Sequence, residues 1–295
     1  MLFGGSARMV LPNIKLLISN IKMHHCYFNG TITPVHETTM QINDLGFLRG
    51  YGMFDYFQTY NGRPFQWDLY WTRYERSAKS LNIPNPIGKD EAYGVVMELL
   101  EKSGLSNCAM RFVLTGGYAE DSISVTKPNL LIISEDTHPS PRDEYEQGIR
   151  VMTHEFVRDI PDVKSTDYKH LIILRDKIKA VGATDVLFHK DGEVSELSRS
   201  NLFIFKGDSL ITSDKNVLNG ITRQTLIDLA KPHFNVEERT VTLDEVLNAD
   251  EIFTSSTTKR VLPVTKVDEH VIGNGKMGDK SRFLLSLIDD MIANW

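Results

Sequence analysis

Short runs of alternating apolar and polar residues begin near residue 26, and turn residues separate them. The stretch "CYFNGTITP" predicts a strand, an Asn-Gly turn and a second strand, and "MFDYFQTYNGRPFQ" repeats this order with Asn61 and Gly62 at the turn. An Asn-Gly pair between alternating runs is the strongest short-range signal of a β-hairpin. We therefore predict two hairpins near the start of the fold.

Two helices are predicted after the hairpins. In "WDLYWTRYERSAKSLNI" apolar and aromatic residues recur at helical intervals, and the pattern stops before "PNP", as helices do near proline. A second helical pattern, "KDEAYGVVMELLEKSG", ends on Gly104. The runs "AMRFVLTGG" and "NLLIISE" then predict two strands.

The composition changes at "DTHPSPRDEYEQG", which is rich in proline and polar residues and has no apolar periodicity. We predict that residues 136–146 link a small α/β domain, 23–135, to a larger domain, 147–295. The larger domain begins with a strand, "RVMTHEF", and a helix over about residues 168–181. Short strands then alternate with helices, which predicts an α+β fold and argues against a doubly wound sheet.

The bulk composition is that of an ordinary soluble protein. At 295 residues the chain is long for a single hydrophobic core, so two domains are expected. A net charge of −6 gives no overall attraction to nucleic acid or anionic membranes. No apolar stretch approaches the ~20 residues that span a bilayer. Cys26 and Cys108 are too few for a disulfide framework, which fits a cytoplasmic protein.

The first 22 residues combine basic residues, an apolar middle and no acid. Lys15 interrupts the apolar middle and no small-residue cleavage site follows, so a secretory signal is not expected. Met23 offers a second start directly before the first strand. We interpret residues 1–22 as a loose tail or an upstream mis-assigned start, with a targeting role as the weaker alternative.

Metal and nucleotide motifs are missing from the sequence. His24 and His25 are adjacent, and no HExxH or CxxC occurs, so metal catalysis is not expected. No phosphate loop of the Walker type is present, and no GxGxxG follows a strand. The chemistry therefore has to come from another set of residues.

The stretch "LNGITRQTL" pairs a glycine with a predicted helix start. Gly220 has no Cβ, so a bulky anion can approach the backbone, and the amides of Ile221 and Thr222 would point toward it. The alternative is a plain helix start that Asn219 or Thr222 caps. The sequence thus predicts either an anion site or an ordinary cap here.

A group of hydroxyl side chains, "TSSTTKR", follows the strand "EIF". Loops that hold ligands tend to lie at such a place, although an ordinary polar turn has the same composition.

The spacing of "ELSRSNLF", "LIT" and "LNGITR" resembles the signature of the class IV aminotransferases. These pyridoxal-phosphate enzymes of fold type IV include branched-chain aminotransferase, D-amino acid aminotransferase and aminodeoxychorismate lyase.

The resemblance extends beyond this signature. The segments "RGYGMFD", "WTRY" and "DVKSTDY" match the family's early glycine-rich strand, its phosphate-binding arginine segment and its catalytic lysine segment, so residues 26–290 are covered. The resemblance implies a two-domain fold in which the larger domain is a pseudo-barrel of mostly antiparallel strands.

The resemblance gives the catalytic role to Lys164, which matches the family lysine that forms the internal aldimine with pyridoxal phosphate. Such a lysine attacks a carbonyl and carries a proton, so its pKa must be lowered by burial or by cationic neighbours. Lys169 is the local rival. Lys164 is preferred because it follows Pro161 in an extended segment before the helix, and a solvated surface lysine is the alternative reading.

The other cofactor contacts come from the same resemblance. Glu196 matches the carboxylate that faces the pyridine nitrogen and favours the protonated ring, which is the stronger electron sink. Its rival is Glu193, in a turn. Arg73 matches the arginine that holds the phosphate with its planar fork, and Arg76 is its rival. Further cofactor contacts are expected from Tyr168, Ile221, Thr222, Ser256 and Thr257.

Three residues are expected on the substrate side. Arg111 stands where branched-chain enzymes place the arginine that meets the substrate carboxylate, and Phe54 and Thr258 are expected near it. Phe54 can equally be a core aromatic. Ala109 replaces the tyrosine usual in branched-chain enzymes, and the arginine and histidine of D-amino acid enzymes are missing after this strand.

The predicted activity is transfer of an amino group between a branched-chain or other apolar L-amino acid and a 2-oxo acid, through Lys164. A lyase of the aminodeoxychorismate type, a D-amino acid aminotransferase and a binding protein without turnover remain alternatives. The family builds its site between two domains and at a dimer interface. A homodimer with small-molecule substrates is therefore expected, with neither nucleic acid nor membrane as a partner.

Overall fold

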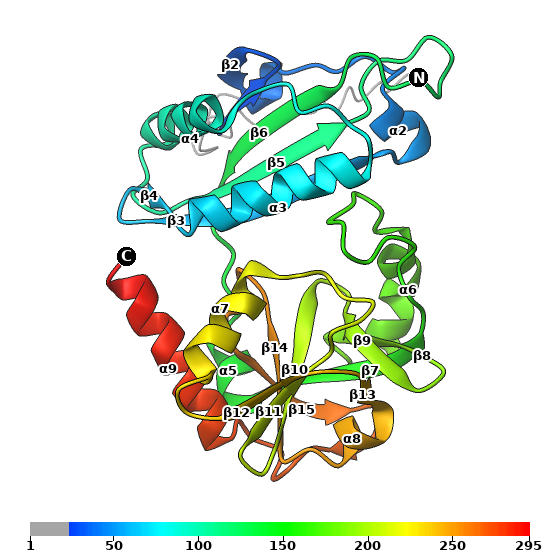
Figure 1. Ribbon diagram of the computed structural model, residues 1–295, viewed down its shortest axis with the longest axis vertical. Coiled ribbons are helices and arrows are strands. Elements are labelled where there is room, and N and C mark those ends of the chain that lie inside the picture. The colour runs from blue at the N-terminus through cyan, green and yellow to red at the C-terminus, as the bar shows by residue number, and fades with distance from the viewer. Residues whose placement is uncertain (1–23) are drawn as a thin grey trace, which may run out of the picture.

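The computed structural model describes residues 24–295, and its strands form two sheets with helices packed against them (Figure 1). The interpretation of residues 1–22 and of a start at Met23 lies outside the described residues. Strands of the first sheet fall within residues 25–135 and those of the second within 149–271. The predicted α+β class is confirmed, whereas the exact domain limits stay a prediction.

In the described part of the chain, the first sheet has six strands in the order β2-β1-β6-β5-β3-β4, all antiparallel to their neighbours. These strands are β1 (His25–Phe28), β2 (Thr31–Pro34), β3 (Gly52–Tyr60), β4 (Arg63–Pro64), β5 (Ala109–Thr115) and β6 (Asn129–Glu135). The helical segments that accompany them are η1 (Val35–Glu37), α2 (Leu45–Arg49), α3 (Trp67–Ser80) and α4 (Lys89–Ser103).

Both predicted hairpins are confirmed. Strand β1 pairs with β2 and β3 pairs with β4, each across an Asn-Gly turn. The φ angles are 46° at Asn29 and 99° at Gly30, and 49° at Asn61 and 74° at Gly62. Positive φ at both central residues matches the turn to the right-handed twist of the paired strands.

Helix α3 packs against the first sheet, and Arg73 lies on its buried face. The apolar residues at helical spacing, Tyr70, Trp71, Tyr74 and Ala78, are all buried. Arg73 shares their face and is only 5% exposed. A buried guanidinium needs a partner, because an unpaired buried charge is strongly destabilising.

Within the described residues the second sheet has ten strands, and six of them close into a ring. Strand β9 pairs with both β8 and β10, so β10, β14, β15, β7, β8 and β9 form the pseudo-barrel, filled by buried aliphatic side chains. Most pairs are antiparallel; β7–β8, β7–β15 and β11–β12 are parallel. The strands are β7 (Ile149–Glu155), β8 (Asp185–Lys190), β9 (Glu193–Leu197), β10 (Ser200–Lys206), β11 (Ser209–Thr212), β12 (Asn235–Glu238), β13 (Val241–Thr242), β14 (Glu251–Ser255), β15 (Leu262–Val267) and β16 (His270–Val271).

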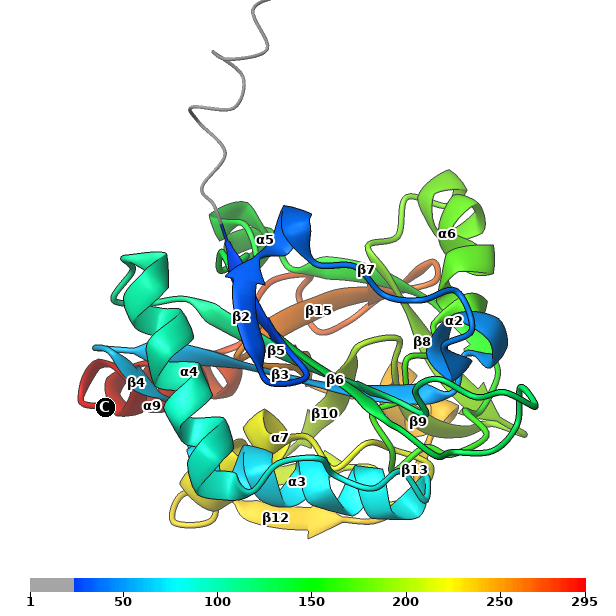
Figure 2. The same ribbon diagram turned by 90° about the horizontal axis from the view of Figure 1, so that it is seen from above.

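Helices surround this barrel (Figure 2). They are α5 (Arg142–Gln147), α6 (Lys169–Ala180), α7 (Ile221–Ala230), α8 (Leu243–Leu247) and α9 (Asp279–Ala293). The short helices α2, α5 and α8 are not visible as apolar periodicity in the sequence, because five or six residues are too few to show a period. Helix α8 forms around a reciprocal cap between Thr242 and Glu245.

A buried ion pair joins strand β8 to the loop after β14. The Lys259 amine lies 2.9 Å from Asp185 Oδ2, and the two side chains are 12% and 3% exposed. The same amine donates to Ser200 Oγ, and Ser198 Oγ donates to Asp185 Oδ1. The pair thus connects the β9–β10 turn to the barrel.

We expect the substitution Asp185→Ala to lower the free energy of unfolding by about 3–5 kcal/mol, because it leaves the Lys259 ammonium buried without its carboxylate. Urea denaturation measures the loss. The double variant Asp185→Ala/Lys259→Met should recover part of it, since no unpaired charge remains. A loss below about 1 kcal/mol in the single variant, the range of an exposed pair, would contradict the burial argument.

Candidate active site

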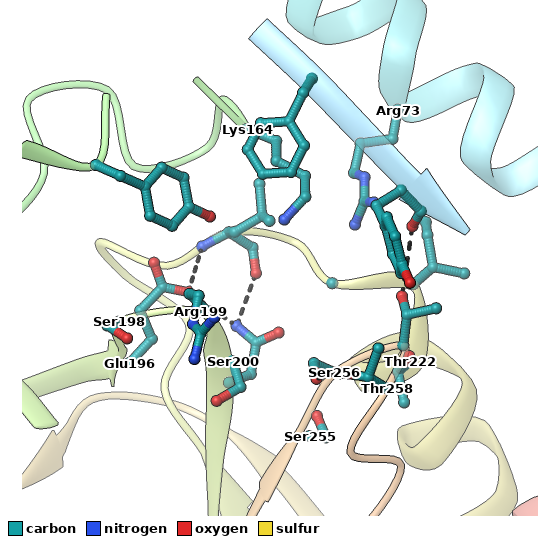
Figure 3. Close-up of a pocket in the computed structure, with 18 of the residues that line it drawn as sticks. Arg73, Lys164, Glu196, Ser198, Arg199, Ser200, Thr222, Ser255, Ser256 and Thr258 are labelled. Atoms are coloured by element: carbon teal, nitrogen blue, oxygen red, sulfur yellow. Dashed lines mark hydrogen bonds between the residues drawn. The ribbon is translucent and has the colours of Figure 1, made fainter. Parts of the chain in front are cut away.

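A cavity of about 610 Å³ lies between the first sheet and the barrel (Figure 3). Its walls come from β3, β5 and α3 on one side, and from the β9–β10 turn, the start of α7 and the loop after β14 on the other. All the site residues predicted from the sequence line this cavity: Phe54, Arg73, Arg111, Lys164, Tyr168, Glu196, Ile221, Thr222, Ser256, Thr257 and Thr258. Their placement is observed, and their roles stay predictions.

Lys164 lies in the extended segment between β7 and α6, and hydrogen bonds tie this segment to strand β3. The Phe54 amide donates to the Lys164 carbonyl at 2.9 Å, and the Thr166 amide donates to the Gly52 carbonyl at 3.0 Å. The Lys164 amine lies 4.5 Å from the centre of the Phe54 ring. Although the lysine follows the predicted linker in sequence, the first sheet therefore positions its backbone.

The surroundings of the Lys164 amine favour its neutral form. Burial lowers its pKa from 10.5 to about 8, and the nearby guanidinium of Arg73 acts in the same direction. The carboxylates of Asp55 and Glu196 oppose this shift more weakly than burial drives it. A lysine whose amine has a substantial neutral fraction near pH 8 can attack a carbonyl or accept a proton.

Glu196 lies on β9 with both carboxylate oxygens bonded. Arg158 Nη2 donates to Oε1, while the Asn201 side-chain amide and the Leu218 backbone amide donate to Oε2 at 3.2 and 3.1 Å. The residue is 5% exposed. Burial raises the pKa of the Glu196 carboxyl, and the positive charge of Arg158 is the main opposing influence.

Arg73 pairs with Asp55 of strand β3. Its Nε donates to Asp55 Oδ2 at 2.9 Å and its Nη2 donates to Oδ1 at 2.5 Å. An arginine has five N–H groups, so this pair leaves donors for a further anion. Asp55 therefore orients the guanidinium at the cavity wall, and the expected contact between Arg73 and a phosphate remains compatible with the geometry.

The start of helix α7 carries free amides. Its N-cap is Gly220, with φ of −66°, and no side chain caps it, so the predicted alternative of a cap from Asn219 or Thr222 is wrong. A Cβ on Gly220 would lie 2.3 Å from Asn201 Oδ1, so close packing against Asn201, and not a positive φ, requires glycine here. The first amides of an uncapped helix attract anions.

Hydroxyl groups face the same helix start across the cavity. Ser255 is 1% exposed, and its Oγ has no hydrogen-bond partner among the described residues. Tyr70 and Thr257 share a hydrogen bond of 2.9 Å between their hydroxyls. An unpartnered buried hydroxyl in a cavity wall is costly unless a ligand supplies the partner. The donors at this end fit a phosphate group.

Phe54 and Tyr168 form an aromatic wall beside Lys164. Their ring centres are 5.7 Å apart with an interplanar angle of 57°. Burial, the largest influence, raises the pKa of the Tyr168 hydroxyl, and the positive charges of Arg158, Arg199 and Arg111 act against it. Tyr168 therefore stays protonated and can donate a hydrogen bond into the cavity.

Arg111 differs from its expected state as a free substrate arginine. Its Nε and Nη2 donate to the two oxygens of Glu135 at 2.6 and 2.9 Å. The guanidinium also lies 5.6 Å from the Phe54 ring centre. Its Nε and one N–H of Nη2 are thus bonded to a carboxylate of the neighbouring strand β6, in the same way that Arg73 is bonded to Asp55.

Arg199 is a cavity residue that sequence reasoning missed. It lies between Ser198 and Ser200 in the β9–β10 turn and is exposed (Figure 3). Three cavity arginines pair with carboxylates, Arg73 with Asp55, Arg111 with Glu135 and Arg158 with Glu196. Arg199 forms no such pair within residues 24–295. The signal was the single arginine of "ELSRSNLF", a stretch in which only the glutamate was singled out.

The rival residues considered for each role lie away from the cavity. Lys169 is 81% exposed and pairs with Asp167. Arg76 is exposed on α3, and Glu193 is exposed at the start of β9. None of the three lines the cavity. Asn201 and Arg158, which hold Glu196, were not predicted; Asn201 is part of "ELSRSNLF", whereas nothing in the pattern marked Arg158.

Two classes of function find no support in the described part of the chain. Between residues 24 and 295, no group of three or more His, Cys, Asp or Glu side chains is arranged to hold a metal ion. Over the same residues, no helix is both long and apolar enough to cross a membrane.

Known proteins resemble this chain along most of its length. The family described as amino-transferase class IV matches residues 52–267. A putative branched-chain-amino-acid aminotransferase of Methanocaldococcus jannaschii is 31% identical, over 91% of this chain and 96% of that protein. A D-alanine aminotransferase of Listeria monocytogenes is 32% identical, over 85% of this chain and 90% of that protein.

A solved structure shares the fold. The branched-chain amino acid aminotransferase of Escherichia coli superposes with a TM-score of 0.85 at 22% identity, covering 92% of this chain and 95% of that one. At this identity the match concerns the fold alone. The family match and the two relatives carry the assignment: the chain belongs to the class IV aminotransferases, which are pyridoxal-phosphate-dependent transaminases.

Proposed function

We propose that this aminotransferase holds pyridoxal phosphate in the cavity described above and transfers amino groups between an apolar amino acid and a 2-oxo acid. The observation that carries the proposal is that Lys164 shares one cavity with Arg73 and Glu196, where burial and the charge of Arg73 lower the pKa of its amine to about 8. An amine of this kind, with a guanidinium on one side and a carboxylate on the other, suits a ring that has an aldehyde, an anionic tail and a basic nitrogen.

The residues of the cavity would hold the cofactor at its two ends. Glu196 would face the ring nitrogen, and Arg73 would contact the phosphate. The start of α7 and the loop after β14 would complete the phosphate site through Ile221, Thr222, Ser256 and Thr257, with Tyr168 beside the ring. When bound, the cofactor supplies the electron-withdrawing ring that stabilises negative charge at the substrate α-carbon.

The chain itself supplies proton transfer and orientation. The neutral amine of Lys164 can accept the α-proton of a substrate and return it, since its pKa lies close to the working range of a general base. Phe54 lies 4.5 Å from the amine, and together with Tyr168 it forms an aromatic wall of the cavity. The aromatic wall also favours an apolar substrate side chain.

The substrate carboxylate requires a cation that is free to bind it. The charge of Arg111 is already paired with Glu135, whereas Arg199 lines the cavity without an ion-pair partner in the described residues. We therefore propose that Arg199 contacts the substrate carboxylate, with Thr258 nearby, in place of the role expected for Arg111. This contact would select amino acids over simple amines.

The donor amino acid is proposed to be a branched-chain or other apolar L-amino acid. The relatives support a D-amino acid as the second candidate. A D-alanine aminotransferase is as similar to this chain as a putative branched-chain enzyme, at 32% and 31% identity. The test is a panel of L- and D-amino acids mixed with the loaded enzyme, with the absorption change of the cofactor as the readout. Conversion by apolar L-amino acids supports the first candidate, and conversion by D-amino acids alone supports the second.

Two further outcomes would exclude transamination. Release of many equivalents of pyruvate per enzyme from added aminodeoxychorismate, with no amino acceptor present, would indicate a lyase, because alanine in a transaminase half-reaction gives at most one equivalent. Absence of any absorption change across the panel would indicate a binding protein without turnover. Either result contradicts the proposed reaction while leaving the fold assignment intact.

The rate at which the cofactor-free protein reacts with pyridoxal phosphate should rise with pH, reach half of its maximum near pH 8, and level off above that. Only the neutral amine attacks an aldehyde, so the rate follows the deprotonated fraction of Lys164, whose pKa is about 8. Stopped-flow absorbance measures this rate. A rate that keeps rising toward the ordinary lysine pKa of 10.5 would contradict the burial of this amine.

We also propose that the enzyme is a cytoplasmic homodimer. Helices α2 and α6 lie on the same side of the molecule (Figures 1 and 2), and both carry exposed apolar side chains. Phe47, Ile172 and Ile173 are 71%, 69% and 75% exposed, which is unusual for a monomer and suits contact with a second copy. The two free, buried cysteines are compatible with a reducing compartment.

A further inference from the structure

Arg158 connects the lysine-bearing segment to the acid of the site. Its Nη2 donates to Glu196 Oε1 and to the Pro161 carbonyl, the latter at 2.8 Å, and its Nη1 donates to the Val163 carbonyl at 3.2 Å. One side chain therefore bonds both to a carboxylate of the barrel and to the backbone directly before Lys164. Its side chain is 22% exposed, and it lines the cavity.

The geometry of these bonds depends on the guanidinium. A planar fork can donate in several fixed directions at once, whereas a lysine ammonium is a single point charge on a flexible stem. The segment from 156 to 168 is not part of a regular helix or strand, so hydrogen bonds must fix its path. Arg158 supplies two of these bonds and anchors them to Glu196.

The charge of Arg158 also acts on the acid. Glu196 is buried, and burial raises the pKa of its carboxyl, while Arg158 is the largest opposing influence and Lys164 a smaller one. The Leu218 amide stabilises the carboxylate as well. Without the guanidinium, the buried carboxyl would take up a proton at a higher pH.

We infer that Arg158 is a positioning residue that sets the spacing between Lys164 and Glu196 and keeps Glu196 ionised. The inference rests on the proposed function, because the cofactor ring must fit between this amine and this acid. A neutral Glu196 could not pair with a protonated ring nitrogen, and a displaced Lys164 could not reach the other edge of the ring. Arg158 thus acts through two residues that contact the cofactor.

The test uses pyridoxamine phosphate as the probe, because it has the ring nitrogen and the phosphate but no aldehyde for Lys164. Its dissociation constant from the cofactor-free protein is measured by calorimetry over a range of pH. The substitution Arg158→Met should weaken binding by about 10- to 100-fold, the size of losing a charge-assisted hydrogen bond. It should also move the fall in affinity at low pH, the acid limb of the binding curve, to a higher pH. The reason is that Glu196 takes up its proton at a higher pH when the guanidinium is gone.

Three further variants isolate the link to Glu196. In a Glu196→Gln background the same Arg158→Met change should cost less than about 3-fold, because the charge pair is already gone. Arg158→Lys should keep the acid limb of the unchanged protein but lose part of the borohydride-reducible link at Lys164, because the backbone bonds are lost. Arg76→Met removes an exposed arginine of α3 that does not line the cavity, and it should leave both the affinity and the acid limb in place.

The outcomes separate this inference from the proposed function. Failure of the unchanged protein to bind pyridoxamine phosphate would overturn the proposed function. Binding by the unchanged protein, together with an Arg158→Met effect that is equally large with and without Glu196, would overturn the inference alone. If Arg158→Met does not fold, an Arg158→Lys protein with a shifted acid limb and an intact lysine link would overturn it as well.

Discussion

Replacing Lys164 with alanine should remove the borohydride-reducible link to pyridoxal phosphate and lower transamination by at least about 10²–10⁴-fold, the usual contribution of a positioned general base. No other lysine of the described chain lines the cavity, so no neighbouring amine can take over. Mass spectrometry of the reduced, digested protein locates the modified residue, and the absorption change with amino acids measures the remaining activity.

The matched control is Lys169→Ala. Lys169 lies five positions later but is 81% exposed and paired with Asp167, outside the cavity. This variant should keep both the link and the activity. A pyridoxyl group found on Lys169, or a link that survives in Lys164→Ala, would show that the lysine has been assigned to the wrong position.

The substitution Arg199→Gln should reduce the preference of the enzyme for an amino acid over the matching amine by about 10- to 100-fold, as expected when a charge-assisted contact to a carboxylate is lost. Leucine and 3-methylbutylamine form such a pair, since they differ only in the carboxylate. The ratio of their rates of absorption change is the measurement. Reaction with the plain amine should change little, because it makes no contact with the guanidinium.

The corresponding change at Arg111 provides the comparison. Arg111 is held by Glu135 at 2.6 and 2.9 Å, so Arg111→Gln should alter the ratio much less than Arg199→Gln does. The opposite pattern, with a loss of preference in Arg111→Gln and none in Arg199→Gln, would return the carboxylate contact to Arg111. It would mean that the ion pair with Glu135 opens when substrate binds.

The sequence was most informative where local rules decide the structure. Both Asn-Gly hairpins form because two consecutive residues with positive φ suit a tight turn, and α3 ends before a proline as predicted. Glu196 and Thr222, which were singled out from the signature stretch, line the same cavity as Lys164. In these cases the information lies in neighbouring residues or in a spacing that the family shares.

Pairings between distant segments could not be read in this way. Arg111 meets Glu135 because β5 and β6 are adjacent in antiparallel register, with Arg111 opposite Ile133, and sequence alone does not specify that register. Arg158 lies in a segment without apolar period, so nothing marked it before its contact with Glu196 was seen. Which arginines are free and which are paired is a property of the three-dimensional arrangement.

The hydrogen bonds that fasten the Lys164 segment to strand β3 have a consequence for motion within the molecule. The backbone of the nucleophile is bonded to the first sheet, Glu196 lies on the seam that closes the barrel, and Arg158 bonds the two segments to each other. A rotation of one half against the other would therefore strain these Arg158 bonds as it changed the gap between amine and acid. A ligand held at both edges would add a second cross-link beside Arg158, so that loading the enzyme would also stiffen the connection between the two halves.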